Sequence, residues 1–305
     1  MLLALALLIG GGALLAVGAE LFAEHVVGTA RRIGLTTFGL AVLLAGAEPE
    51  EALVAGFAAA RGRPDLAAGD VLGANLVIAT LTLGLVMLVA PIALSAAVRR
   101  YAAAAALASG LATLLLVGGQ VTRGEGLLLV LVYVVAVAGV WRLERRPPVV
   151  GEAGGLDPSG STYEAPLLAL GVAGMVCGGV LAVLGAERVV AATGLADGPI
   201  GLTLLALATS AEMLALAAAA RRHGSDEVAV AGALGAVAYN ATFSLAVGAL
   251  VAPLALTATS ALLAVSAVVI AGCIVVAGWP RAAAGHAVGL VLVLAYAVAV
   301  AFVLA

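Results

Sequence analysis

Long apolar runs, broken by short polar connections, occupy the chain from its first residue to its last. A membrane-spanning helix needs about 20 mostly apolar residues, and ten stretches meet this requirement. They cover approximately residues 2–24, 34–60, 68–93, 99–119, 124–142, 166–188, 199–221, 227–252, 256–278 and 284–304. The pattern therefore predicts an all-α membrane protein with about ten transmembrane helices.

One polar stretch is longer than any other connection. Residues 144–165 are rich in Pro, Gly and charged side chains, a composition that suits a linker. Five predicted helices precede it and five follow it. We therefore expect a first half at residues 1–143, a linker at 144–165 and a second half at 166–305.

The two halves share a repeated sequence. Residues 39–94 align without a gap with residues 201–256, at a shift of 162 residues, and 20 of the 56 pairs are identical. A composition this narrow would match roughly one pair in eight by chance, so the excess indicates an internal repeat. Glu50 aligns with Glu212. A carboxylate therefore recurs at equivalent places in two apolar runs.

The arginines predict how the helices cross the bilayer. An excess of basic residues marks cytoplasmic connections, and the connections after odd-numbered helices carry ten arginines against four after even-numbered ones. Both termini are then extracytoplasmic and the linker is cytoplasmic. Because each half has five helices, the second half enters from the opposite side. Inverted repeats of this kind are typical of secondary transporters, which bind substrate near the midplane between the repeats. The ten arginines are Arg31, Arg32, Arg99, Arg100, Arg142, Arg145, Arg146, Arg221, Arg222 and Arg281, and the four are Arg61, Arg63, Arg123 and Arg188.

The composition supports the same class. Apolar residues make up 64% of the chain and charged residues 10%, whereas a soluble domain carries about 25% charged residues. We expect an integral protein of a prokaryotic-type plasma membrane, surrounded by lipid. The sequence offers no basic patch for nucleic acid, and no nucleophile–base pair, phosphate loop or Cys/His cluster that would indicate an enzyme or a resident cofactor.

Four glutamates lie well away from the ends of predicted helices: Glu48, Glu50 and Glu51 in the second and Glu212 in the seventh. A charge at the bilayer centre costs about 2.5–3.5 kcal/mol, so such residues usually face the protein interior and serve function. The repeat favours Glu50 and Glu212, whereas Met213 replaces Glu51 in the second half. The alternative, a neutral carboxylic acid hydrogen-bonded between helices, stays open.

Other oxygen atoms accompany these glutamates. Pro49, if it lies within a helix, frees the carbonyl group of Ala45. Thr209 and Ser210 offer hydroxyl groups beside Glu212. Carboxylate, hydroxyl and carbonyl oxygens are the ligands that hard cations such as Ca²⁺ prefer.

Two asparagines fall in the third and eighth predicted helices. Asn75 and Asn240 each carry an amide oxygen, but in the gapless alignment Asn75 faces Val237 and Asn240 faces Ile78. Both remain candidate cation ligands, with interhelical hydrogen bonding as the alternative. The nearby spacing of Gly69 and Gly73 favours close packing of two helices.

These motifs resemble the repeats of the calcium/cation antiporter superfamily, which includes sodium/calcium exchangers. Those repeats read approximately G-L-T-x-x-x-x-G-T-S-L-P-E and G-N-x-x-G-S-N-I-x-N. The counterparts here are GLAVLLAGAEPE and GDVLGANLVI in the first half, and GLTLLALATSAE and GALGAVAYN in the second. The resemblance implies that Glu50 and Glu212 bind the metal ion. Glu51 competes with Glu50, because it has the family's distance from Gly46. The candidate cation-binding residues are Glu50, Glu212, Glu48, Glu51, Thr209, Ser210, Asn75 and Asn240.

The chain also departs from the family pattern. Ala47 and Glu48 stand where Thr and Ser are usual, alanines replace both motif serines, and Ile78 and Val237 replace asparagines. Oxygens of the kind that bind sodium are therefore depleted, while a carboxylate is gained.

The resemblance implies a secondary antiporter that exchanges Ca²⁺ or a related cation for Na⁺ or H⁺ by alternating access. Crowded carboxylates in a low-dielectric site favour protonation, so the proton is the simpler counter-ion. The alternative is a diverged membrane scaffold that retains the fold without transporting.

Overall fold

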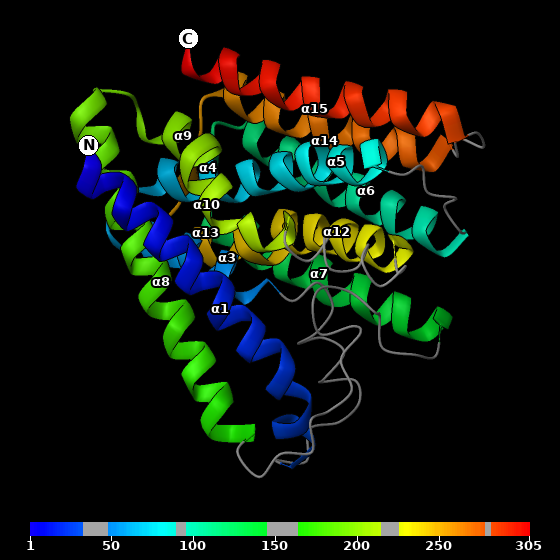
Figure 1. Cartoon of the computed structure of the whole chain (residues 1–305), viewed down its shortest axis with the longest axis horizontal. Helices are drawn as coiled ribbons and strands as arrows, with labels where there is room; N and C mark the ends of the chain where they lie inside the picture. Colours follow the sequence, from blue (N-terminus) through cyan, green and yellow to red (C-terminus); the bar gives the residue numbers. More distant parts are fainter. Residues whose placement is uncertain (33–47, 90–95, 145–163, 215–225, 278–281) are drawn as a thin grey trace.

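The computed structural model describes residues 1–32, 48–89, 96–144, 164–214, 226–277 and 282–305, and most of them are helical (Figure 1). Before the predicted linker come α1 (Leu2–Arg32), α3 (Pro49–Ala60), α4 (Pro64–Leu76), the π-helix η1 (Val77–Thr82), α5 (Leu83–Val89), α6 (Ala96–Val117) and α7 (Arg123–Glu144). After it come α8 (Glu164–Thr193), α9 (Asp197–Ile200), the π-helix η3 (Gly201–Leu205), α10 (Ala206–Thr209), α12 (Asp226–Tyr239), the π-helix η4 (Asn240–Ser244), α13 (Leu245–Val251), α14 (Ala258–Ala277) and α15 (Ala282–Leu304).

Five helical stretches within the described residues are long and apolar enough to cross a membrane. They are Leu2–Val26, Pro64–Val89, Ala165–Thr193, Val230–Val251 and Gly285–Leu304. The protein is therefore a predominantly helical, integral membrane protein. Parts of the predicted spans 34–60 and 199–221, and residues 145–163 of the predicted linker, lie outside the described residues, so the count of ten spans stays a prediction.

The sequence repeat is also a repeat of local structure. Helices α4 and α12 begin at Pro64 and Asp226, and α5 and α13 begin at Leu83 and Leu245. Each pair is separated by the same 162 residues that separate the aligned sequences. A short π-helix lies between the two α-helices in both cases. The matched sequences therefore fold into matched elements.

Helices α1 and α8 lie side by side and cross the remaining helices steeply (Figure 1). Glycines allow this contact: a Cβ atom at Gly11 would lie 2.5 Å from the Ala182 backbone nitrogen, and one at Gly178 would lie 2.7 Å from that of Leu15. Gly18 and Gly171 approach the partner backbone as closely. Small residues let helices associate in lipid, where the apolar solvent provides little hydrophobic drive.

Glycines also bring α4 against the segment formed by α9 and η3. A Cβ atom at Gly69 would lie 2.6 Å from the Gly198 carbonyl oxygen, and one at Gly73 would lie 2.5 Å from that of Leu202. The close packing predicted from the spacing of Gly69 and Gly73 is confirmed. It brings Asp70, on the same helix, beside the end of α10.

One short strand pair departs from the all-α expectation. β1 (Gln120–Val121) pairs antiparallel with β2 (Leu254–Ala255), with Val121 opposite Leu254. Both strands lie in connections between helices, where the backbone groups need partners that the helices no longer supply. The pair joins the α6–α7 connection to the α13–α14 connection.

The packing of α1 on α8 can be tested with adjacent glycines. Gly11→Ala should destabilise the protein by about 1–3 kcal/mol, because the methyl group would meet the α8 backbone. Gly10→Ala is the matched control, since no atom lies within 4 Å of a Cβ atom there, and alanine favours a helix over glycine by about 1 kcal/mol. The measurement is the unfolding midpoint in detergent. Equal midpoints for the two variants would contradict the contact.

Candidate cation site

Each repeat has a non-helical residue at the acidic motif, Glu48 in the first and Ser210 in the second, and we call these two positions the interruptions. Helix α3 begins at Pro49, after the non-helical Glu48, and α10 ends at Thr209, before Ser210 at φ −85° and ψ 8°. The backbone nitrogen of Glu51 donates to the carbonyl oxygen of Glu48 at 3.2 Å, and Met213 donates in the same way to Ser210 at 3.1 Å. The two interruptions are therefore equivalent in the repeat.

The start of α3 corrects the expectation that Pro49 lies within a continuous helix. Proline is tolerated at the first helical position, where its missing N–H group has no partner to lose. The expected free carbonyl of Ala45 lies outside the described residues. Glu50 and Glu51 instead occupy the first turn of α3, where the partial positive charge of the helix N-terminus favours carboxylates.

Three carboxylates from two segments, one in each repeat, meet at these interruptions. Glu48, Glu50 and Glu212 each place one oxygen within 4.8 Å of the others, and their exposed fractions are 1%, 0% and 5%. The predicted approach of Glu50 to Glu212 is confirmed. Neither carboxylate oxygen of Glu50 meets a hydrogen-bond donor among the described residues.

Asn240 holds the Glu48 side of this cluster. Its amide nitrogen donates to Glu48 Oε2 at 2.6 Å, and its Oδ1 accepts from Ser244 Oγ at 2.9 Å. The predicted site residues Asn240 and Glu48 are therefore in direct contact. The sequence alignment alone did not pair them, because they come from different segments of the two repeats.

A second pair of carboxylates lies beside the interruption at Ser210. Ser210 Oγ donates to Glu51 Oε1 at 3.3 Å, and Thr209 Oγ1 lies 3.2 Å from Asp70 Oδ1. Glu51 and Asp70 are within electrostatic reach of one another. The remaining oxygens, Glu51 Oε2 and Asp70 Oδ2, have no hydrogen-bond partner among the described residues. We call Glu51, Asp70, Thr209 and Ser210 the second acidic group.

Asp70 is the site residue that the sequence reasoning missed. It is fully buried, and it lies in the predicted span 68–93, in the segment GDVLGAN. A carboxylate in an apolar span is the same signal that drew attention to Glu50 and Glu212.

Asn75 does not join either acidic group. Its amide nitrogen donates to the carbonyl oxygen of Val237 at 3.1 Å, which is the interhelical bond that the alternative predicted. Its Oδ1 has no partner among the described residues. Asn75 therefore links α4 to α12, and its role as a cation ligand has no contact to support it.

Aromatic side chains cover one side of the site. The ring centroids of Tyr133 and Tyr239 are 5.5 Å apart, and those of Tyr239 and Phe243 are 5.1 Å apart. Ala52, one turn after Glu48, packs into the same cluster. These rings come from α7, α12 and η4, and Tyr239 lies within electrostatic reach of Glu48, Glu50 and Glu51.

The chemistry of the site follows from the burial of carboxylates that have no basic side chain beside them among the described residues. The described residues place no basic side chain against Glu50, Glu51 or Asp70. A buried carboxylate needs a counter-charge or a proton. Carboxylates with hydroxyl and amide oxygens at hand can hold a hard cation. This arrangement suits a cation that enters and leaves, because none of the described residues supplies a permanent positive charge beside Glu50, Glu51 or Asp70.

Known proteins are similar to this chain in sequence and in fold. The family model described as "Sodium/calcium exchanger protein" matches residues 3–142 and 164–305. CaxA of Alkalimonas amylolytica, which carries the name of an antiporter, is 30% identical over 262 residues, covering 83% of this chain and 82% of that protein. The inner membrane protein YrbG of Escherichia coli K12 is 30% identical over 268 residues, covering 83% of this chain and 81% of that protein.

A solved structure gives the fold. The sodium-calcium exchanger NCX_Mj, soaked with 2.5 mM Na⁺ and 10 mM Sr²⁺, superposes with a TM-score of 0.65 at 22% identity and covers 98% of both chains. A likeness at this identity concerns the fold alone. The described helices therefore follow the architecture of that exchanger.

The charge cluster predicts a specific pattern of thermal stability. Glu50→Gln and Glu212→Gln should each raise the unfolding midpoint in cation-free buffer at pH 8, because each removes a buried charge that repels its neighbours. Ca²⁺ at 100 times its dissociation constant should stabilise the parent protein by about 2.7 kcal/mol. Both variants should lose most of that stabilisation.

The control is Glu20→Gln, because Glu20 is exposed on α1. It should respond to Ca²⁺ like the parent protein. Full stabilisation of both cluster variants by Ca²⁺ would contradict binding at Glu50 and Glu212.

Proposed function

The chain belongs to the sodium/calcium exchanger protein family, and from this membership we propose that it exchanges Ca²⁺ or a related cation for protons by alternating access. The family is one of transporters rather than enzymes, and its members act on inorganic cations in a membrane. The observation that carries the proposal is the meeting of Glu48, Glu50 and Glu212 in the protein interior.

The proposed cation ligands come from the interruptions of both repeats. Glu50 and Glu212 supply the central carboxylates, and Glu48, held by Asn240, supplies a third. The second acidic group is close by, because Thr209 and Ser210, which precede Glu212 in the chain, contact Asp70 and Glu51. A scaffold that no longer transports would have no reason to keep charges in positions that cost stability.

We propose that the architecture is two inverted halves of five helices. Two contacts support a two-fold relation between the repeats. Asn75 donates to Val237, its own counterpart in the alignment, and the carboxylate of Glu50 meets that of its counterpart Glu212. In a two-fold arrangement, only residues beside the axis can touch their own counterparts. The division at residues 144–165 and the extracytoplasmic termini belong to the same proposal.

The proposed counter-ion follows from the oxygen-bearing side chains that this chain has gained and lost relative to the family pattern. Ala74, Ala236, Ile78 and Val237 are all buried, and none offers a side-chain oxygen. Glu48 and Asp70 add carboxylates instead. A carboxylate can carry a proton when the cation leaves and release it when the cation returns. Exchange by competition for the same oxygens therefore needs no separate sodium site.

The test is uptake of Ca²⁺ into vesicles that contain the purified protein. With sodium absent, an imposed proton gradient should drive uptake, because protons and cations compete for the carboxylates. Glu212→Gln should abolish this uptake while the protein stays folded, since glutamine keeps the size of the side chain but loses its charge. Glu20→Gln should retain it.

Different failures have different meanings. Uptake that appears only under a sodium gradient would contradict proton exchange and would require sodium ligands outside those named here. No uptake under either gradient, together with no effect of Ca²⁺ on the unfolding midpoint, would favour the non-transporting scaffold.

A further inference from the structure

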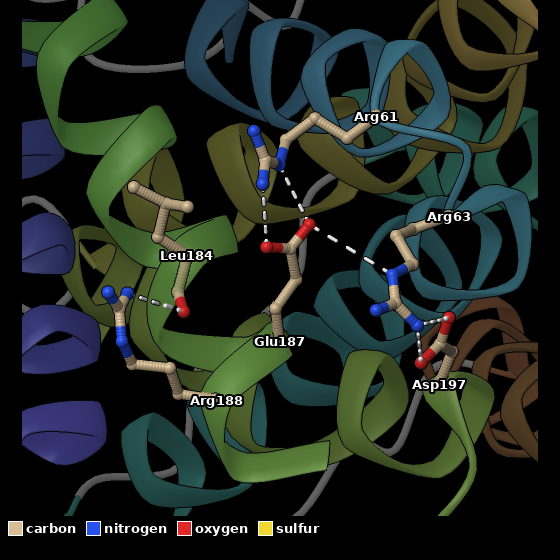
Figure 2. Close-up of polar contacts among 6 residues, drawn as sticks. All are labelled: Arg61, Arg63, Leu184, Glu187, Arg188 and Asp197. Atoms are coloured by element: carbon tan, nitrogen blue, oxygen red, sulfur yellow. Dashed lines mark hydrogen bonds and ion pairs between the residues drawn. The ribbon is translucent and has the colours of Figure 1, made fainter. Parts of the chain in front are cut away.

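Four charged side chains form an ion-pair cluster at the turn between α3 and α4 (Figure 2). Arg61 donates from Nε to Glu187 Oε1 at 2.7 Å and from Nη2 to Glu187 Oε2 at 2.8 Å. Arg63 Nη1 donates to both carboxylate oxygens of Asp197 at 3.2 Å, and its Nε lies 4.0 Å from Glu187 Oε1. The cluster joins the α3–α4 turn to α8 and to the start of α9.

The backbone of the turn fixes the two arginines. Gly62 lies between them at φ +74°, in the left-handed region that closes many helix C-termini. Gly62 N donates to Ala59 O at 3.0 Å, and Arg63 N donates to Ala58 O at 2.9 Å. The guanidinium groups therefore start from a rigid turn, which lowers the entropy cost of holding both carboxylates.

The cluster touches both segments that carry the cation site. Helix α3 has Glu50 in its first turn and ends just before Arg61. Its 12 residues rise 1.5 Å each, so the cluster lies about 18 Å along the helix from the acids. Asp197 begins the segment that continues through η3 and α10 to Thr209. Each segment therefore has a cation ligand at one end and a member of the ion-pair cluster at the other.

We propose that Arg61, Arg63, Glu187 and Asp197 form a latch that closes the passage between the cation site and this face of the protein. The latch ties α3 and the α9–α10 segment to α8. Glu50 is fully buried beneath it, and so is Val54, which packs against Gly179 of α8. In this proposal an ion reaches this face when α3 and α8 separate, and their separation breaks the Arg61–Glu187 pair. The proposal rests on the proposed antiport, which requires such a passage.

The strength of the cluster suits a latch that opens. A single exposed ion pair contributes little to stability, and Arg61 and Arg63 keep 46% and 40% of their side-chain surface exposed. The carboxylates are better protected, at 16% and 18%, and the bidentate geometry of Arg61 strengthens the pair. Salt should weaken the latch, because its charges remain within reach of solvent.

The test measures access to α3 with a thiol reagent. Val54→Cys, in a background with Cys177 and Cys273 changed to Ser, places a thiol between the latch and the site. In detergent, Arg61→Gln and Glu187→Gln should each raise the rate of labelling by a charged, water-soluble thiol reagent about fivefold. A change of about 1 kcal/mol in favour of molecules in which α3 and α8 are separated would have this effect. The Arg61→Gln/Glu187→Gln double variant should label no faster than either single variant, because both remove the same pair.

Arg188→Gln is the matched control. Arg188 follows Glu187 on α8, but its Nη1 donates to Leu184 O of its own helix at 3.4 Å, as Figure 2 shows. Its removal should leave the labelling rate at the parent value. Equal rates in all variants, or the same acceleration from Arg188→Gln, would overturn the latch.

A second measurement covers the case in which Val54→Cys does not fold. Hydrogen exchange of the parent protein and of Glu187→Gln, each with its native Val54, should show faster exchange in residues 53–60 and 197–209 of the variant. Unchanged exchange in both segments would overturn the latch. Neither measurement needs a transported ion, so their failure is distinct from a failure of the proposed antiport.

Discussion

Buried carboxylates with no basic side chain beside them among the described residues are the constraint on which the rest of this structure depends. Glu50, Glu51 and Asp70 are each at most 1% exposed, and the described residues set no basic side chain against them. Burying such groups is costly unless a proton or a cation compensates. These groups therefore suit the binding of a proton or a cation, and the proposed exchange would follow from competition of the two for the same oxygens.

The helices are built to bring these groups together. Interruptions at Glu48 and Ser210 let two segments end at the site, and Pro49 and the first turn of α3 suit such an end. Close packing through Gly69 and Gly73 then sets Asp70 beside Thr209. Bulkier residues at these glycines would hold α4 away from η3. Glycines also join α1 to α8, so close backbone contact adds to the packing of apolar side chains in this part of the protein.

The sequence predicted the site residues that occupy equivalent positions in the two repeats. Glu50 and Glu212 were paired by their places in the alignment, and their carboxylates meet. The contact of Asn240 with Glu48 breaks the symmetry, so alignment could not find it. The Asn75 side chain has an amide oxygen that could bind a cation, but its amide nitrogen donates to a backbone carbonyl of α12. Three-dimensional packing decides between a cation ligand and an interhelical hydrogen bond. The helix start at Pro49 was not predicted because the apolar residues on both sides of the motif were assigned to one span, although proline at that place favours a helix beginning.

The central claim is that one cation binds between the two repeat glutamates. The most direct measurement is the anomalous scattering of a crystal of this protein grown with Sr²⁺ in place of Ca²⁺. The account predicts an anomalous peak within about 3 Å of oxygen atoms of both Glu50 and Glu212, as hard-cation coordination requires. A crystal in which Sr²⁺ scatters only elsewhere, with both carboxylates ordered and no peak between them, would contradict it.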